Sequence, residues 1–303
     1  MFSFKGLKIA ALAGLALGAL SLPATAKDVI GASLLTQSHP FYIDLGEAMK
    51  KEAEKQGVTL DISIANQDLN KQLADIEDFI TKKVDVIVLS PVDSDGVRNI
   101  IRKAEKANIK VITVDIPANG VKVASHIGTD NYAGGVKAGE MMAKLTDGKG
   151  EIAVINYPTV QSVVDRVKGF SKALEAHKDM KIVANQAGIT RAEALATAEN
   201  ILKANPKIVG IFGFGDDAAL AAAAAVKAAK LENQVKVIGF DGMKEARDAV
   251  DSDPVFAAVV RQYPDKMGQT AVQSAVKIMK GETVPELQPI VPGMYVRGGD
   301  VKE

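Results

Sequence analysis

The hydrophobic positions of this chain follow two alternating patterns from residue 27 onward. Short and nearly continuous apolar runs, rich in Val and Ile, are each followed by a longer stretch in which apolar residues recur every three or four positions. The short runs predict strands that are buried on both faces, and the longer stretches predict amphipathic helices. Strands that alternate with helices in this way indicate βαβ units and a parallel sheet with helices on both faces.

The pattern predicts two successive series of strands. The first series comprises 29–35, 59–64, 84–89, 110–114 and 124–127, and the second comprises 151–156, 181–185, 208–212, 235–240 and 256–260. Helices are expected at about 40–56, 70–82, 94–107, 131–146, 160–177, 191–204, 216–231, 242–252 and 264–280. Each series has the order of a doubly wound half-molecule. We therefore expect an α/β protein with two doubly wound parallel-sheet lobes joined by a multi-strand hinge.

The break between the two series falls at residues 129–135, where a strand-like run gives way to a helix. Because the last predicted helix and the tail after Pro285 add to both halves, the chain is expected to cross between the lobes more than once. The expected crossings lie near 127–131, 260–264 and 289–293. The expected lobes are 27–129 plus 263–290 for the N-terminal one, and 130–262 plus 291–303 for the C-terminal one.

The first 26 residues have the pattern of a secretory signal peptide. Lys5 and Lys8 precede an apolar run from Ile9 to Leu22, and the small residues Ala24-Thr25-Ala26 follow it. A membrane-spanning helix needs about 20 apolar residues, so this shorter run favours a leader that is cut after Ala26. The residue after the cut is not a cysteine, so no lipid anchor is expected. We expect a soluble, monomeric protein of the periplasm.

Composition limits the possible functions. Removing 26 of the 303 residues leaves about 277, which is more than one hydrophobic core usually organises and agrees with two lobes. The formal net charge is zero, whereas a protein that binds nucleic acid needs a basic face. The chain has no cysteine, so disulfides, thiolate metal sites and cysteine nucleophiles are excluded.

Signals for an enzyme are weak. The three histidines, His39, His126 and His177, lack the spacing of metal ligands, so no metal site is expected. The segment 213–218, Gly-Phe-Gly-Asp-Asp-Ala, fits a dinucleotide-binding fingerprint and opens a helix. Its two aspartates, however, would repel a pyrophosphate at the helix N-terminus. No cofactor is expected, and an NAD-dependent oxidoreductase remains a remote alternative.

Polar residues stand where the predicted strands end. In open parallel sheets, ligands bind beyond the carboxyl ends of the strands, and these positions also suit helix caps. The residues at these ends are Thr36, Ser90, Asp115, Asn156, Asp216, Asp241 and Gln262. Because they occur in both series, they predict a binding site between the two lobes.

Several short motifs occur together with these strand ends. They are His39-Pro40-Phe41-Tyr42, Ser90-Pro91-Val92-Asp93-Ser94, Val114-Asp115, Thr129-Asp130-Asn131, Gly239-Phe240-Asp241-Gly242 and Gln262-Tyr263-Pro264-Asp265. Their order resembles that of the periplasmic ribose-binding protein family over essentially the whole mature chain. Members of that family are two-lobed sugar receptors of ABC importers.

The resemblance implies which residues hold the ligand. It implies that Phe41 and Tyr42 stack on a sugar ring and that Asp115 and Asp241 accept hydrogen bonds from its hydroxyls. Charge-assisted hydrogen bonds of this kind are stronger than neutral ones. The remaining polar contacts that we expect come from Thr36, His39, Ser90 and Gln262.

The chain departs from the family pattern at several positions. Ile116 stands where the ribose-type pattern has an arginine, a second arginine is missing near Val164, and Gly215 replaces an asparagine. The second-lobe aromatic aligns with Ile189 or Thr190. The positions added to the site are Val164, Ile189, Phe214 and Gly215, and the residues that could fill the gaps are Phe214, Tyr157, Gln161, Arg166 and Arg191. Arg166 and Arg191 could equally form salt bridges on a helix surface.

The expected function is capture of a small, neutral sugar or polyol, with an alditol or a pentose other than ribose favoured. The lobes would close over the ligand and present it to the permease of an ABC transporter. One alternative is a periplasmic sensor that signals to a chemoreceptor or kinase through the same closure. A sugar-responsive repressor would need a basic DNA-binding headpiece before the first strand, where this chain has a leader.

Overall fold

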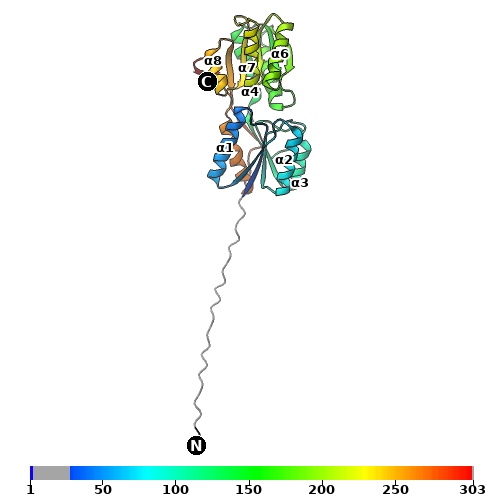
Figure 1. Ribbon diagram of the computed structural model, residues 1–303, viewed down its shortest axis with the longest axis vertical. Coiled ribbons are helices and arrows are strands. Elements are labelled where there is room, and N and C mark those ends of the chain that lie inside the picture. The colour runs from blue at the N-terminus through cyan, green and yellow to red at the C-terminus, as the bar shows by residue number, and fades with distance from the viewer. Residues whose placement is uncertain (3–27, 302–303) are drawn as a thin grey trace.

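The computed structural model describes residues 1–2 and 28–301 (Figure 1). The predicted leader and its cut after Ala26 fall, beyond the first two residues, outside the described part. Two α/β lobes lie one above the other, each with helices on both sides of its own sheet (Figure 1). The expected fold class is thereby confirmed. No helix of the described residues is long and apolar enough to cross a membrane.

The first lobe contains a parallel sheet in the order β11-β5-β4-β3-β1-β2. Its strands are β1 (Val29–Leu34), β2 (Thr59–Ile64), β3 (Val86–Leu89), β4 (Lys110–Val114), β5 (Ser125–Thr129) and β11 (Leu287–Ile290). The helices α1 (Pro40–Gln56) and α9 (Pro264–Met279) pack together on one face, as the blue and orange helices of the lower lobe in Figure 1 show. The helices α2 (Leu69–Lys82) and α3 (Arg98–Lys106) cover the other face.

Strand β3 shows how a continuous apolar run contributes side chains to the cores on both faces of the sheet. Val86 and Val88 belong to the core beneath α1 and α9, whereas Ile87 and Leu89 belong to the core beneath α2 and α3. Successive side chains of a strand point to opposite faces. All four side chains are therefore buried, which is the reason that the sequence shows no polar position in this strand.

The second lobe has a mixed sheet in the order β13-β12-β10-β9-β8-β6-β7. Its strands are β6 (Lys149–Asn156), β7 (Asp179–Ala187), β8 (Ile208–Gly213), β9 (Lys236–Asp241), β10 (Phe256–Arg261), β12 (Gly293–Val296) and β13 (Gly299–Asp300). Strands β6 to β10 are parallel, β12 pairs with β10 in antiparallel orientation, and β13 pairs in antiparallel orientation with β12. The sequence pattern did not predict β11, β12 or β13.

Helices again cover both faces of the second sheet. The helices α4 (Asn131–Leu145) and α5 (Gln161–Leu174) share a core with Phe212 and Phe240. The helices α6 (Arg191–Ala204), α7 (Asp216–Ala228) and α8 (Lys244–Ser252) lie on the other core. Most alanines of α7 are buried there, and their small side chains allow the helix to pack closely on the sheet.

The chain passes between the two sheets three times within the described residues. It leaves β5 for α4 through residue 130, leaves β10 for α9 through residues 262–263, and leaves β11 for β12 through residues 291–292. The helix α9 and the strand β11 therefore belong with the first lobe although they follow the second in sequence. This arrangement places Gln262 between the lobes.

Two glycines bring α4 and α5 unusually close together. A Cβ atom at Gly135 would lie 2.0 Å from the carbonyl oxygen of Arg166, and one at Gly169 would lie 2.1 Å from that of Tyr132. Any larger side chain would force the helices apart, which makes such substitutions destabilising. The close approach holds the first turns of α5, which include Arg166, next to the N-terminal end of α4.

Candidate functional site

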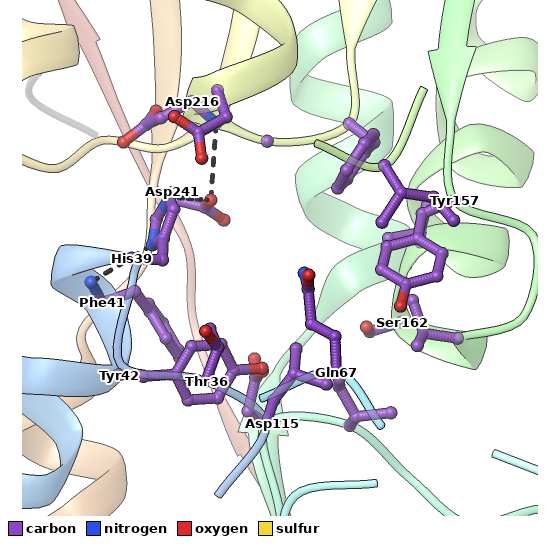
Figure 2. A pocket seen from close by; sticks show the side chains of 18 of the residues that line it. Thr36, His39, Phe41, Tyr42, Gln67, Asp115, Tyr157, Ser162, Asp216 and Asp241 are labelled. Atoms are coloured by element: carbon purple, nitrogen blue, oxygen red, sulfur yellow. Dashed lines mark hydrogen bonds and ion pairs between the residues drawn. The ribbon is translucent and has the colours of Figure 1, made fainter. Parts of the chain in front are cut away.

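A cavity of about 410 Å³ lies where the ends of the parallel strands of the two lobes face each other. Figure 2 shows Thr36, Tyr42 and Asp115 along one side, His39, Asp216 and Asp241 on another, and Tyr157 and Ser162 across from them. Its lining also includes Phe41, Gln67, Ile116, Val160, Val163, Arg166, Ile189, Thr190, Arg191, Phe214, Gly215 and Gln262. The position agrees with the rule that ligands of such sheets bind beyond the carboxyl ends of the strands.

Two buried aspartates occupy corresponding positions in the two lobes. Asp115 follows β4, the fourth strand of the first lobe, and Asp241 ends β9, the fourth strand of the second. Both have a left-handed backbone, with φ values of 65° and 96°. A residue other than glycine rarely adopts this conformation, and such strain tends to accumulate at functional sites.

Asp241 is the centre of a hydrogen-bond network. Its Oδ1 accepts from Gln262 Nε2 at 2.7 Å and from Arg166 Nη1 at 3.2 Å. Its Oδ2 lies 3.4 Å from the backbone nitrogen of Asp216 and 3.6 Å from Nε2 of His39. Donors from both lobes and from the crossing at Gln262 therefore converge on one carboxylate.

Arg166 is buried rather than placed on the helix surface. Its Nε donates to Asn131 Oδ1 at 2.8 Å, its Nη1 donates to the carbonyl oxygen of Phe214 at 2.7 Å, and its guanidinium lies 3.9 Å from the ring centre of Phe240. The alternative of a surface salt bridge is wrong for this residue. It is the buried cation that compensates Asp241.

Asp115 lines the cavity, and one of its carboxylate oxygens is hydrogen-bonded whereas the other, Oδ1, is buried without a hydrogen-bond partner among the described residues. Its Oδ2 accepts from the hydroxyl of Tyr42 at 2.6 Å, and Ser90 donates to that hydroxyl at 3.4 Å. Burial raises the pKa of Asp115 to about 6, although the positive charge of Arg166 and the hydrogen bond from Tyr42 oppose the rise. Burial and the neighbouring Asp115 charge also raise the pKa of Tyr42.

His39 caps the helix α1. Its Nδ1 accepts a hydrogen bond from the backbone nitrogen of Phe41 at 3.2 Å, so a proton on the neutral ring belongs on Nε2, which points toward Asp241. The capping bond fixes the orientation of the ring. Phe41 and Tyr42 follow in the first turn, and their rings make an edge contact with centres 5.1 Å apart.

Asp216 links the start of α7 to the turn after β9. Its carboxylate accepts from the backbone nitrogens of Gly242 at 3.1 Å and Met243 at 2.8 Å. Burial and the charge of Asp241 raise its pKa. The adjacent Asp217 pairs with Arg191, which also pairs with Glu245 on α8. The N-terminus of α7 is thus occupied by carboxylates.

His39, Asp216 and Asp241 each offer one atom to a possible cation, and these atoms lie within 4.8 Å of one another. The carboxylate oxygens, however, already accept hydrogen bonds from the protein. Arg166 would in addition repel a cation placed beside Asp241. We therefore assign no metal to this cluster.

One side of the cavity is apolar. It is formed by Ile116 from the first lobe and by Val160, Val163, Ile189 and Phe214 from the second. The ring of Tyr157 meets that of Phe214 edge to face, with centres 5.7 Å apart. These side chains belong to, or pack against, one core cluster that continues from the first lobe into the second.

Most of the predicted site residues line the cavity. Those that do are Thr36, His39, Phe41, Tyr42, Asp115, Asp241, Gln262, Ile189, Phe214 and Gly215. Ser90 is fully buried behind the Tyr42 hydroxyl, and Val164 is 39% exposed outside the lining. Among the residues considered for the gaps, Tyr157, Arg166 and Arg191 line the cavity and Gln161 does not.

Sequence reasoning missed several lining residues, among them Gln67, Val160 and Ser162. Gln67 follows the second strand, and the strand-end rule would have found it had it been applied to Ala65-Asn66-Gln67. Val160 and Ser162 lie at the start of α5, where no polar cap marks the helix. No local signal distinguishes them from core residues.

The two lobes also touch beside the cavity, through hydrogen bonds that we call the clasp. The backbone nitrogen of Ser94 donates to the carbonyl oxygen of Thr159 at 3.1 Å, and the nitrogen of Gln161 donates to Ser94 Oγ at 2.9 Å. Asn119 Nδ2 donates to Gln161 Oε1 at 3.2 Å. Ser94 and Asn119 belong to the first lobe, and their partners belong to the second.

Comparisons with known proteins agree with this geometry. A family model described as a periplasmic binding protein domain matches residues 30–283. The chain is 35% identical to the ribose import binding protein of Escherichia coli K12 over 272 residues, covering 89% of this chain and 91% of that protein.

Solved structures show the same similarity. A solute-binding protein of an ABC transporter from Mycobacterium smegmatis, with bound glycerol, is 34% identical with a TM-score of 0.84, over 89% of this chain and 94% of the other. The myo-inositol binding protein of Caulobacter, bound to myo-inositol, is 29% identical with a TM-score of 0.85, and the match covers 92% of this chain and 96% of that protein.

Proposed function

We propose that this chain, which belongs to the periplasmic binding protein domain family, captures a small sugar or polyol between its lobes for delivery to an ABC importer. The observation that carries the proposal is the pair of buried carboxylates, Asp115 and Asp241, one from each lobe, at a cavity that also has aromatic rings. Hydroxyl groups donate to carboxylates, and the weakly apolar face of a sugar or polyol carbon chain suits Phe41 and Tyr42.

Closure follows from the division of contacts between the lobes. Asp115, Tyr42 and Phe41 belong to the first lobe, whereas Asp241 and Arg166 belong to the second. A ligand that reaches both sets binds the closed form better than the open one, and this difference shifts the equilibrium toward closure. The clasp adds contacts that only the closed form makes.

We propose a binding protein rather than an enzyme. Nδ1 of His39 is occupied by the backbone nitrogen of Phe41, and Nε2 faces Asp241, so the imidazole has no nucleophile as its partner. Ser38, its neighbour in sequence, shares a hydrogen bond with Thr36 instead. The carboxylates of Asp216 and Asp217 at the N-terminus of α7 argue against a dinucleotide for the electrostatic reason given above.

Location and partners are also part of the proposal. The lysines and apolar run of residues 1–26, together with the match to a periplasmic binding protein domain, support export to the periplasm, and Ala24-Thr25-Ala26 supports a cut after Ala26. We propose the lobe boundaries 27–129 plus 263–290 and 130–262 plus 291–303, supported by the two sheets. The closed monomer would present both lobes to a membrane permease.

Thermal unfolding with a panel of ligands tests the proposal. The protein is first unfolded and refolded to remove any retained ligand, and its melting temperature is then measured with pentoses, hexoses, alditols, amino acids and NAD. At least one sugar or polyol should raise the melting temperature by several degrees, because a ligand at 1,000 times its Kd stabilises by about 4 kcal/mol. A dominant shift with NAD, or none with any sugar or polyol, would contradict the proposed function.

Ser94→Ala should weaken ligand binding without removing a ligand contact. The variant loses the hydroxyl that accepts from the backbone nitrogen of Gln161, and a hydrogen bond of this kind contributes about 1 kcal/mol. We expect ligand to dissociate about five times faster, with little change in the association rate. Ser252→Ala is the matched control, because that hydroxyl bonds within α8. Equal dissociation rates in both variants would show that the clasp does not hold the closed form.

A further inference from the structure

We propose that Asn131 is a positioning residue of the binding site, which holds the guanidinium of Arg166 in the orientation in which it pairs with Asp241. This inference deepens the proposed function and rests on it. Asn131 belongs to the Thr129-Asp130-Asn131 motif, to which the ligand contacts proposed above give no role. It lies at the first crossing between the lobes and does not itself line the cavity.

The side-chain amide of Asn131 bonds to both lobes. Its Oδ1 accepts from Nε of Arg166 at 2.8 Å, and its Nδ2 donates to the carbonyl oxygen of Thr129 at 2.9 Å. Thr129 ends β5 of the first lobe, whereas Arg166 lies on α5 of the second. Asn131 is 6% exposed and Arg166 is 4% exposed, so solvent has little access to either bond.

The bond to Asn131 fixes the plane of the Arg166 guanidinium. The carbonyl oxygen of Phe214 and Oδ1 of Asp241 both accept from a single nitrogen, Nη1. A planar group that is anchored at one nitrogen can turn about it, whereas anchors at two nitrogens, here Nε and Nη1, fix its orientation. The ring of Phe240 lies 3.9 Å from the guanidinium, and such a stacked contact still allows the guanidinium to rotate in its own plane.

The orientation of Arg166 matters because a buried carboxylate depends on it. Nη1 lies 3.2 Å from Oδ1 of Asp241, which is longer than the roughly 2.7–2.9 Å of most charged hydrogen bonds. A rotation of the guanidinium that lengthens this contact further would leave the charge of Asp241 poorly compensated. Arg166 also lines the cavity, so the same rotation would move atoms beside the ligand.

The second crossing between the lobes supports the same carboxylate directly. The backbone nitrogen of Gln262 donates to the carbonyl oxygen of Asp241 at 2.9 Å, and its Nε2 donates to Oδ1 at 2.7 Å. Asp241 is therefore held from one crossing by Gln262 and from the other by Asn131 through Arg166. A site whose side chains are ordered beforehand binds more tightly, because the ligand does not have to order them. Asn131 thus contributes to affinity without contacting the ligand.

Three variants separate the positioning of Arg166 from other effects at the crossing. Asn131→Ala removes both hydrogen bonds of the amide. Asn131→Asp keeps an oxygen that accepts from Arg166 but loses the donor to Thr129. Asp130→Ala is the matched control, because it removes the helix cap that Oδ1 of Asp130 forms with the backbone nitrogen of Ala133 and leaves the amide of Asn131 in place.

Calorimetric titration of the ligand-free protein measures the Kd values with D-ribose, D-xylose, ribitol and myo-inositol as probes. The probe with the lowest Kd for the unmodified protein is then used for every variant. Asn131→Ala should raise this Kd about tenfold, as expected when binding must order one further long side chain. Asn131→Asp and Asp130→Ala should stay within about threefold of the unmodified protein, although Asp130→Ala loses a helix cap and should unfold at a lower denaturant concentration.

Circular dichroism establishes that each variant is folded. If Asn131→Ala does not fold, Asn131→Ser replaces it with the same expectation, because its shorter side chain cannot span the distance to Arg166. An unchanged Kd in the folded variant would overturn the positioning role and leave the proposed function intact.

A double-mutant cycle tests whether Asn131 acts through Arg166. Arg166→Lys keeps the positive charge but has a single nitrogen, so it cannot be anchored at two points. Asn131→Ala should therefore raise the Kd by no more than about twofold in the Arg166→Lys background. Additive losses, or equal losses in Asn131→Ala and either Asn131→Asp or Asp130→Ala, would assign the effect to the crossing and overturn the inference. Failure of all four probes to bind the unmodified protein would overturn the proposed function as well.

Discussion

Replacing Asp241 with alanine should weaken ligand binding at least about a hundredfold and also destabilise the protein. The carboxylate accepts from Arg166 and Gln262, and we propose that it accepts ligand hydroxyls as well. Hydrogen bonds to a charged group contribute about 1.5–3 kcal/mol each, so the Kd should rise at least about a hundredfold. Removing one partner of a buried ion pair costs about 3–5 kcal/mol because Arg166 is left uncompensated. Calorimetric titration and denaturant unfolding measure the two effects.

Asp241→Asn separates the two consequences. Asparagine tolerates the left-handed backbone at this position and keeps an oxygen that can accept from Gln262. We expect the loss of affinity to remain large and the loss of stability to be smaller than for alanine. If Asp241→Ala bound ligand within about threefold of the unmodified protein, the cavity between the lobes would not be the binding site.

Replacing Asp115 with asparagine should weaken binding yet stabilise the ligand-free protein at neutral pH. Folding raises the pKa of Asp115 from 3.8 to about 6, because burial disfavours the charged form. A raised carboxyl pKa contributes stability below about pH 4, and that contribution is lost as the pH rises through 6. At pH 7.5 the buried charge therefore costs roughly 2–3 kcal/mol. Asparagine removes this cost and still accepts from Tyr42.

The measurements for Asp115→Asn are the free energy of unfolding at pH 7.5 and pH 4, and the Kd from pH 5 to pH 8. The variant should be more stable than the unmodified protein at pH 7.5 and not at pH 4. Its Kd should be at least about thirtyfold higher at pH 7.5, because the charged acceptor is gone.

The same groups predict how binding depends on pH in the unmodified protein. A ligand that donates to the Asp115 carboxylate favours its charged form, so affinity should fall as the pH drops below about 6. The charged and titratable groups facing Asp115 are Tyr42, His39, Arg166 and Asp241. Asp115→Asn should flatten the dependence, which separates Asp115 from His39. A variant that kept the full pH dependence would contradict the role given to Asp115.

The elements of regular structure could largely be predicted from the sequence, and the exceptions have physical causes. The helix expected from residue 94 begins at Arg98, because Asp93 accepts from the backbone nitrogens of Asp95 and Gly96 and holds a turn. Ser94 is meanwhile bonded to Thr159 of the other lobe. The short strands β11 and β12 were missed because they form by pairing with β5 and β10, which are distant in sequence.

The part of the candidate site that follows the ends of the parallel strands could be predicted from the sequence. The carboxyl ends of parallel strands meet at one edge, and this rule located Thr36, Asp115, Asp241 and Gln262 around the cavity. It could not show that Ser90 lies behind Tyr42 rather than in the lining. Nor could it show that Arg166 is buried, because that depends on how closely Gly135 and Gly169 let α4 and α5 approach.

The sequence by itself determined the two-lobed α/β architecture and the strand ends that carry the chemistry, because hydrophobic period and strand polarity are local properties of the chain. Only the tertiary structure decided which polar atoms satisfy one another. Gln262 and Asp241 are hydrogen-bonded, Tyr42 and Asp115 are hydrogen-bonded, and one oxygen of Asp115 and one of Gln262 have no hydrogen-bond partner among the described residues. These pairings join residues from separate strands and helices. The packing of the two lobes sets the distances between these residues. Those distances determine which donors and acceptors around the cavity are bonded to one another.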